Sequence, residues 1–243
     1  MRRANGSLST SGRHSRKIES VMVSRLRTLL VFTAAGAAAV PVLAALLSMA
    51  AQQDAAPGGP GPGKFLVARR ELPDPNFENS VILLIQYNAK AAMGLVINHR
   101  TDIPLSRVLK DVPQAKGRDD RLYIGGPVQR GALLALQRSR EEFESAGHVL
   151  GEIHLIADRA LLEKALAAKT GPDRLRVYAG YSGWGPGQLD REMMSETWHV
   201  LPGSPDLVFD PRPEDVWQRL IRRTELRYVF HWTPETAERA SGA

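Results

Sequence analysis

The residues best suited to do chemistry lie in the glycine-rich run Gly180–Leu189. Backbone N–H groups can converge on an anion where a glycine-rich turn joins a strand to a helix. Here the strand-like run 175–179 precedes the turn, and the helix-forming run 188–194 follows it. The sequence therefore offers a site for a small ligand or a nucleotide, whose candidate contacts are Gly183, Trp184, Gly185, Gly187 and Gln188.

The same run can instead be a rigid turn that lets Trp184 pack beneath a sheet. It has neither the Gly-Lys-Ser/Thr ending of a phosphate-binding P-loop nor the glycine spacing of a dinucleotide-binding fold. Trp184 and Pro186 also fill space that a phosphate loop keeps open. The missing phosphate motif favours the rigid turn, and the ligand site is the alternative.

Three more polar residues are candidate ligand contacts with simpler structural roles. Asp74-Pro75-Asn76 is a turn sequence, because aspartate accepts backbone N–H bonds and proline presets φ. Phe77 is then expected to enter the core. Asn98 follows an apolar strand, where its amide can bond a neighbouring backbone. We keep Asp74, Asn76 and Asn98 as candidate contacts, and we predict structural roles for them.

No motif for catalysis or metal binding is complete. The chain has no cysteine, which excludes a thiolate nucleophile and a cysteine-based zinc site. Ser182 lies one glycine short of a Gly-x-Ser-x-Gly nucleophile motif, because residue 184 is tryptophan. Glu192 and Glu196 share a helix face, as many solvated carboxylates do. The later histidines lack the spacing of helix-borne metal ligands, and they are His99, His148, His154, His199 and His231. The sequence thus favours a protein without catalytic residues, metal or cofactor.

The net charge of +6 is concentrated at the N-terminus. Residues 1–27 hold seven basic residues and one acidic residue, which leaves 25 of each from position 28 onward. A domain that binds a phosphate backbone usually carries a basic excess that displaces counterions. Nucleic acid is therefore not an expected partner.

Residues 28–51 carry no charged side chain and follow a basic segment. A basic region, an apolar stretch and small residues at its end are typical of a signal peptide. Ser48-Met49-Ala50 provides the small residues, and Met22 is a candidate translation start. Because about 20 apolar residues can span a bilayer, an uncleaved membrane tether through 28–51 is the alternative. We expect residues 1–51 to export or anchor the chain on the periplasmic side, with a cytoplasmic protein as the alternative.

Short β-type runs dominate the chain after the Pro/Gly-rich linker 52–63. They are 65–68, 81–86, 93–97, 121–124, 132–136, 152–156 and 175–179. The second and third runs flank a polar segment around Asn88 and are predicted to pair as a hairpin. Asp158 can cap a helix over 159–169 that stops at Gly171, and Pro213 can begin another. Because strands mostly follow strands, the pattern predicts an α+β fold.

Four segments of the chain resemble the YqgE/AlgH family. They are Asp74-Pro75-Asn76-Phe77, Gly94-Leu95-Val96-Ile97-Asn98, Gly125-Gly126-Pro127-Val128 and Gly180-Tyr181-Ser182-Gly183-Trp184-Gly185-Pro186-Gly187-Gln188-Leu189. The resemblance implies a single domain over 64–232, with a bifurcated, partly barrel-like sheet flanked by helices and a tail at 233–243. The chain departs from the family at Tyr87, where histidine is usual, and at Ser182, where alanine is common.

The resemblance implies no established molecular activity. We favour a non-catalytic regulatory or protein-interaction domain, whose protein partner the sequence does not identify. Family members are often labelled transcriptional regulators, a label that rests on association and not on a DNA-binding motif. The alternative is a small-ligand or nucleotide-binding protein, and even an enzyme, that uses the Gly180–Gln188 loop.

Overall fold

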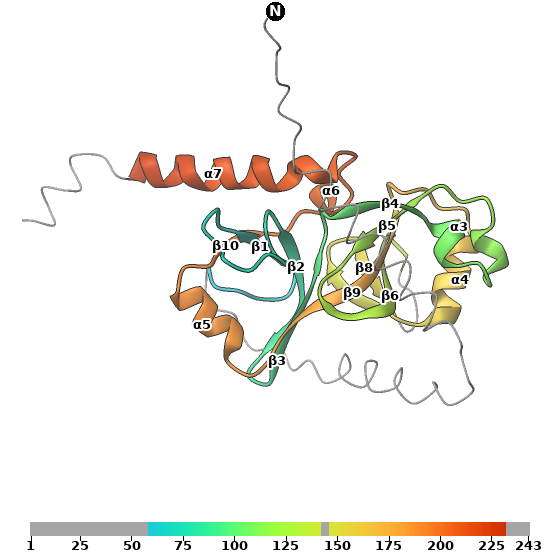
Figure 1. Cartoon of the computed structure of the whole chain (residues 1–243), viewed down its shortest axis with the longest axis horizontal. Helices are drawn as coiled ribbons and strands as arrows, with labels where there is room; N and C mark the ends of the chain where they lie inside the picture. Colours follow the sequence, from blue (N-terminus) through green and yellow to red (C-terminus); the bar gives the residue numbers. More distant parts are fainter. Residues whose placement is uncertain (1–57, 142–145, 232–243) are drawn as a thin grey trace, which may run out of the picture. The chain divides into compact units, whose positions relative to one another are not determined.

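Ten strands pair into one sheet in the computed structural model (Figure 1), which describes residues 58–141 and 146–231. The strands are β1 Lys64–Ala68, β2 Val81–Asn88, β3 Ala91–Val96, β4 Arg100–Pro104, β5 Arg121–Ile124, β6 Val128–Arg138, β7 Gly147–Leu150, β8 Ile153–Ile156, β9 Leu175–Trp184 and β10 Trp198–Pro202. The helices are α3 Leu105–Val108, α4 Arg159–Ala167, α5 Gln188–Met194, α6 Pro205–Val208 and α7 Val216–His231, with 3-10 turns at Pro113–Ala115 and Pro213–Asp215. The predicted α+β class is confirmed.

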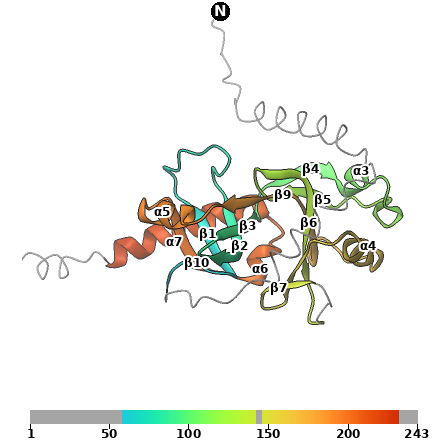
Figure 2. The same cartoon turned by 90° about the horizontal axis from the view of Figure 1, so that it is seen from below.

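Strand β9 is shared by two parts of the sheet. The strand order is β10-β1-β2-β3-β9-β6-β8-β7, and β5 joins β9 while β4 joins β5. Tyr178 and Ala179 pair with both β6 and β5, and Ser182 to Trp184 pair with β3. Figures 1 and 2 show β9 running between β1, β2, β3 and β10 and the remaining strands. The sheet therefore divides at β9, as the word bifurcated implies.

The barrel-like part that the resemblance implies is not confirmed. Within the described residues the strand order runs from β10 to β7 and does not return to its start. All strand pairs are antiparallel except β5 with β9. The sheet is therefore open and mixed, with one parallel pair at the division.

The predicted hairpin is formed by β2 and β3. Their register runs from the pair Ile82 and Val96 to the pair Asn88 and Ala91. The Asn88 side-chain oxygen accepts the backbone N–H groups of Lys90 at 2.9 Å and Ala91 at 3.1 Å. An asparagine side chain that bonds the backbone two residues on reproduces a turn. The polar segment at Asn88 thus closes the hairpin.

The strand β1 is buried on both faces, which explains its unbroken apolar sequence. Because successive side chains of a strand point to opposite faces, Phe65 and Val67 enter one apolar cluster and Leu66 and Ala68 enter another. The helix α7 lies along β10 and β1 (Figure 1). Its Trp217 indole N–H donates to the carbonyl of Ala68 at 2.8 Å, which fixes α7 to the sheet.

The helix α4 begins at its predicted cap and ends earlier than predicted. The Asp158 carboxylate accepts the backbone N–H of Leu161 at 3.0 Å. The helix ends at Ala167, and Lys169 adopts a left-handed φ of 51°. The chain therefore reverses at Lys169 before it reaches Gly171, the predicted stop. Pro213 begins a 3-10 turn that leads into α7, as predicted.

The expected export or anchor segment lies outside the described residues, as do the linker up to residue 57 and the tail at 233–243. Those assignments stay predictions. Among the helices that the structure describes, none is both long enough and apolar enough to cross a membrane.

The segment at Gly125 passes close to β9 at Gly180, and this close approach leads to a prediction about stability. A Cβ atom on Gly125 would lie 2.3 Å from the carbonyl oxygen of Gly180, so one backbone segment must move away from the other. We expect Gly125→Ala to lower the free energy of unfolding by about 1–3 kcal/mol or more, as overpacking does. Urea denaturation measures this loss.

The matched control is Gly131→Ala on β6, where an added Cβ atom meets nothing within 4 Å. We expect its unfolding midpoint to match that of the parent chain. Equal midpoints for the Gly125 and Gly131 variants would contradict the close approach at β9.

Candidate functional site

The run Gly180–Leu189 is not one loop, which corrects the sequence-based interpretation. Its first half continues β9 as far as Trp184, and α5 begins at Gln188. Only Gly180, with φ of 70°, and Gly187, with φ of 64°, adopt the left-handed backbone that favours glycine within this run. Gly183 and Gly185 do not, so the run consists of a strand end, a short three-residue connection and the start of a helix.

Trp184 packs against two other aromatic rings. It is 4% exposed, stacks on Phe77 with ring centroids 6.2 Å apart, and meets Trp198 edge-on at 6.3 Å. Phe77 also meets Trp198 edge-on at 5.7 Å. The turn that begins at Asp74 thus delivers Phe77 onto the end of β9, and the predicted packing role of Trp184 is confirmed.

Glu192 holds the two indoles together. Its Oε2 atom accepts the indole N–H groups of Trp184 and Trp198, each at 2.9 Å. Its Oε1 atom accepts the side-chain amide of Gln188 at 3.1 Å. The helical spacing of Glu192 indicates a solvated carboxylate, and that prediction is wrong. Hydrogen bonds to a charged acceptor are stronger than neutral ones, so Glu192 fixes α5 to the sheet.

Gln188 uses its remaining side-chain atom on the turn itself. Its Oε1 atom accepts the backbone N–H of Gly185 at 3.2 Å. This donor is one that an anion would need, and the glutamine already occupies it. Tyr87, on β2, donates its hydroxyl to Asp190 in the first turn of α5, and this bond raises the pKa of Tyr87 to about 12. The side chains of α5 therefore satisfy the polar groups around the turn.

The other candidate contacts have the predicted structural hydrogen bonds. The Asp74 carboxylate accepts the backbone N–H of Asn76 at 2.8 Å. The Asn98 side chain accepts the N–H of Val81 at 2.7 Å and donates to the carbonyl of Asn79 at 2.8 Å. The structure thus brings the turn at Asp74 next to Trp184 through Phe77, whereas Asn98 joins the end of β3 to the start of β2. A ligand-binding role for these residues stays a prediction.

All four segments that carry the family resemblance meet around β9. Gly94 pairs with Ser182, and the carbonyl of Gly125 accepts both the Val96 N–H at 2.9 Å and the Ser182 hydroxyl at 3.2 Å. A Cβ atom on Gly94 would lie 2.5 Å from a methyl group of Ile82. The first segment reaches the same place through Phe77. These motifs therefore specify how the chain crosses itself.

Ser80 and His99 form a pair that resembles a nucleophile and its base. The Ser80 hydroxyl lies 3.3 Å from Nε2 of His99, and burial lowers the pKa of His99. Ser80, however, is 0% exposed, so a substrate carbonyl has no approach to its oxygen. The pair fits a buried structural hydrogen bond better than a catalytic dyad.

A large concavity lies away from these motifs, between β6 and α4. It has a volume of about 1290 Å³ and is lined from 137–141 at the end of β6, from 161–174 on α4 and the turn after it, and from 206–211 at α6. We call it the β6–α4 groove. Arg140, on its rim, has a side chain that is 89% exposed. The groove is therefore open to solvent.

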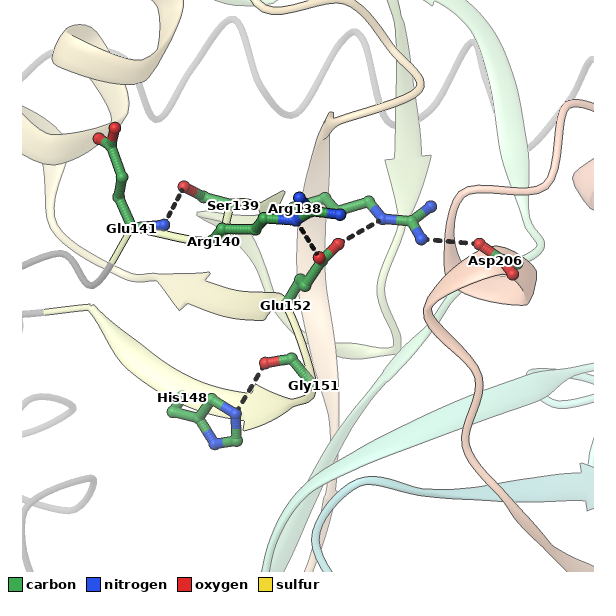
Figure 3. Close-up of polar contacts among 8 residues, drawn as sticks. All are labelled: Arg138, Ser139, Arg140, Glu141, His148, Gly151, Glu152 and Asp206. Atoms are coloured by element: carbon green, nitrogen blue, oxygen red, sulfur yellow. Dashed lines mark hydrogen bonds and ion pairs between the residues drawn. The ribbon is translucent and has the colours of Figure 1, made fainter.

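Ion pairs fix one side of this groove (Figure 3). Arg138 contacts Glu152 at 3.3 Å and Asp206 at 2.7 Å, and Arg140 contacts the other oxygen of Glu152 at 2.8 Å. The hydrogen bonds from Arg140 and Arg138 lower the pKa of Glu152, and those to Asp206 and Glu152 raise the pKa of Arg138. Both arginine charges are thus compensated within the protein.

A second cavity of about 610 Å³ adjoins the groove and shares Asp173, Phe209 and Pro211 with it. It is lined by Arg176, which is 4% exposed. The guanidinium lies 4.9 Å from the ring centre of Tyr123 and donates to the carbonyl of Val208 at 2.8 Å. Arg176 therefore joins β9 to the end of α6.

The described residues contain no group of three histidine, cysteine, aspartate or glutamate side chains that could hold a metal ion. The β6–α4 groove has no signal in the sequence. Its residues come from segments between positions 137 and 211, and no motif connects them.

Comparisons with known proteins show one consistent likeness. The AlgH-like family model matches residues 65–229. The UPF0301 protein of Streptomyces coelicolor is 33% identical over 170 residues, which cover 66% of this chain and 85% of that protein. The UPF0301 protein AlgH of Pseudomonas aeruginosa is 36% identical over 156 residues, which cover 62% of this chain and 82% of that protein. Neither name states an activity.

Two solved structures are similar to this one. A crystal structure of a Corynebacterium diphtheriae protein has a TM-score of 0.56 and 26% identity, and the match covers 68% of this chain and 87% of that one. The solution structure of the Pseudomonas aeruginosa AlgH protein has a TM-score of 0.53 and 30% identity, with 74% of this chain and 94% of that one covered.

The double indole contact of Glu192 can be tested by substitution. We expect Glu192→Leu to lower the free energy of unfolding by about 2–3 kcal/mol, because two indole donors lose a charged acceptor. Glu192→Gln keeps an acceptor oxygen and should lose less. Denaturant unfolding followed by tryptophan fluorescence measures both variants.

Met194→Ala is the control on the same helix, since this side chain is 77% exposed. It should change stability by no more than about 0.5 kcal/mol. If Glu192→Leu were as stable as Met194→Ala, Glu192 would not connect α5 to the sheet.

The buried position of His99 predicts a pH dependence. Because burial lowers its pKa, the unfolded chain binds a proton at higher pH than the folded chain does. Its contribution to stability is full above the unfolded pKa of about 6.5 and is lost as the pH falls through the lower folded pKa. We expect His99→Gln to lose less stability than the parent chain between about pH 7 and pH 5.

His199, whose pKa is also lowered by burial, keeps part of the effect in the variant. Urea midpoints at the two pH values measure the difference. An identical loss of stability in parent and variant would show that His99 titrates as it does in the unfolded chain.

Proposed function

The chain belongs to the AlgH-like family, and we propose that it is a non-catalytic domain that binds another protein. The binding site in this proposal is the β6–α4 groove. The transcriptional label of the family would then describe an effect exerted through a protein partner. Direct contact with DNA is not part of the proposal, because the carboxylates of Glu141 and Asp173 also line the groove and would repel a phosphate backbone.

The size and openness of the groove carry this proposal. Pockets for small molecules typically have volumes of about 300–1,000 Å³ and enclose most of their ligand. The groove has a volume of about 1290 Å³, and its rim includes the exposed side chains of Arg140, Lys164 and Lys169. A site of this kind suits a segment of a protein better than an enclosed metabolite.

The chemistry of the other candidate positions supports a binding role over catalysis. The hydroxyl of Ser80 is buried, and Gln188 occupies the Gly185 N–H that an anion would need. A ligand at the Gly180–Gln188 turn would have to displace Gln188 from both Gly185 and Glu192. The small-ligand alternative therefore carries the extra cost of breaking two hydrogen bonds.

Photo-crosslinking of the full chain in the cell that makes it tests the proposal. A photoreactive amino acid in place of Lys164, which is exposed on α4 and lines the groove, should give a discrete adduct with a second protein. The control replaces Lys90, which is exposed in the β2–β3 turn and does not line the groove. It should give no such adduct.

A chain that gives no adduct from Lys164, or the same adducts from both positions, would contradict binding at the groove. A thermal shift produced by a metabolite in the parent chain and abolished in Gln188→Ala would instead favour the small-ligand alternative at the turn.

A further inference from the structure

The cations of the β6–α4 groove fall into two groups. Arg138 and Arg140 are paired with Glu152 and Asp206. Lys164, Lys169 and Arg174 also line the groove, and their side chains make no ion pair or hydrogen bond within the described part of the chain. Lys164 lies on α4, and Lys169 and Arg174 lie in the segment that joins α4 to β9. One wall of the groove therefore carries three positive charges that have no ion-pair partner among residues 58–141 and 146–231.

The helix dipole of α4 is a simpler explanation for a cation in this wall. Lys164 lies in the last turn of α4, where a cation interacts favourably with the helix dipole. That explanation does not extend to Arg174, which precedes β9. It also leaves the floor of the groove unexplained.

The floor contains a buried amide whose hydrogen bonding is incomplete within the described parts of the chain. Gln137 lines the groove and is 6% exposed, and its buried Oε1 atom accepts no hydrogen bond from any residue that the structure describes. A buried acceptor without a donor costs stability, and such groups are uncommon. Because rotating the amide exchanges its oxygen and nitrogen, this side chain can present an acceptor to a ligand N–H.

The groove also contains negative charge. The carboxylates of Glu141 and Asp173 line it, and no ion pair to either is found in the described residues. A uniform polyanion such as a nucleic-acid backbone would be repelled at these two positions. A chain in which acidic residues alternate with neutral ones can place its carboxylates on the cations and avoid Glu141 and Asp173.

We propose that the β6–α4 groove binds an acidic segment of a partner protein, in which acidic and neutral residues are interspersed. Its carboxylates contact Lys164, Lys169 and Arg174, and its main-chain N–H groups reach Gln137. This inference rests on the proposed function and adds the chemistry of the partner. Two observations favour an acidic segment in the groove. One is the set of unpaired cations on one wall, and the other is the Gln137 oxygen that lacks a hydrogen-bond partner among the described residues.

Fluorescence anisotropy with the full chain tests the charge preference. The probes are labelled peptides of equal length that alternate Glu with Ser, Gln with Ser or Lys with Ser. The Glu–Ser peptide should bind most tightly, and its affinity should fall as salt is added. Tighter binding of the Gln–Ser or Lys–Ser peptide would overturn the inference.

Two triple variants locate the binding. Combining Lys164→Gln, Lys169→Gln and Arg174→Gln should weaken Glu–Ser binding about tenfold, since each exposed pair contributes about 0.5 kcal/mol. The matched control combines Lys90→Gln, Arg107→Gln and Lys110→Gln. These residues are exposed, lie outside the groove, and remove the same charge. If both triple variants lost the same affinity, the Glu–Ser peptide would be attracted by the charge of the whole surface, and the groove would not be its binding site.

Gln137→Met separates binding from stability. Methionine has a similar size and no unsatisfied acceptor, so the free chain should melt at a higher temperature while Glu–Ser binding weakens. A variant that binds as tightly as the parent chain would remove Gln137 from the site. Inorganic phosphate is then added to the bound peptide, with chloride at the same ionic strength as the control. If phosphate displaces the peptide and chloride does not, the groove binds a small anion and the proposed acidic segment is overturned.

These results are distinguishable from failure of the proposed function. An adduct from Lys164 without a preference for the Glu–Ser peptide keeps protein binding and overturns the acidic segment. Absence of the adduct overturns protein binding itself, whichever peptide binds in solution.

Discussion

The close approach of backbone segments at β9 is the constraint on which the rest of the structure depends. A Cβ atom on Gly125 or Gly180 would lie within 2.8 Å of a backbone oxygen of the other crossing segment. This contact allows β9 to pair with β5 and β6 in its first half and with β3 in its second. Without it the two parts of the sheet would not share a strand. The groove, which is lined by residues between β6 and α6, depends on the same strand because β6 pairs with it.

Local sequence signals predicted the elements whose geometry is local. Asn88 closes its hairpin and Asp158 caps α4 through bonds to backbone groups two or three residues away. The same reasoning failed at Gly180, because glycines that follow a strand usually indicate a turn. Here the glycine lets β9 continue past another segment of the same chain. The choice between a turn and a crossing depends on Gly125, which lies far away in the sequence.

The spacing of residues along the sequence does not predict the interactions at the candidate sites. Glu192 lies four residues from Gln188 on α5, which predicts a shared helix face, but the indole of Trp198 reaches it only because β10 folds back. The amphipathic pattern of α5 gives no sign of that acceptor. The groove is even harder to predict from spacing. Its residues Gln137 and Arg174 come from distant parts of the sequence and are brought together by the pairing of β6 with β9. Charge counts from the sequence give a neutral domain and do not separate paired from unpaired cations.

The family resemblance and the candidate function occupy different places in the molecule. The four recognisable segments meet at β9, where they provide glycines for close approach, a turn and a packed tryptophan. Their polar groups bond the backbone, as Gln188 and Asn98 show, or the side chain of Glu192. The cations and the buried amide oxygen that lack a partner among the described residues lie in the β6–α4 groove, outside all four segments. Motifs that specify a chain crossing serve the fold and do not depend on what the protein binds. The groove is therefore the part of the structure in which members with the same motifs can differ in partner, because its charges can change without disturbing β9.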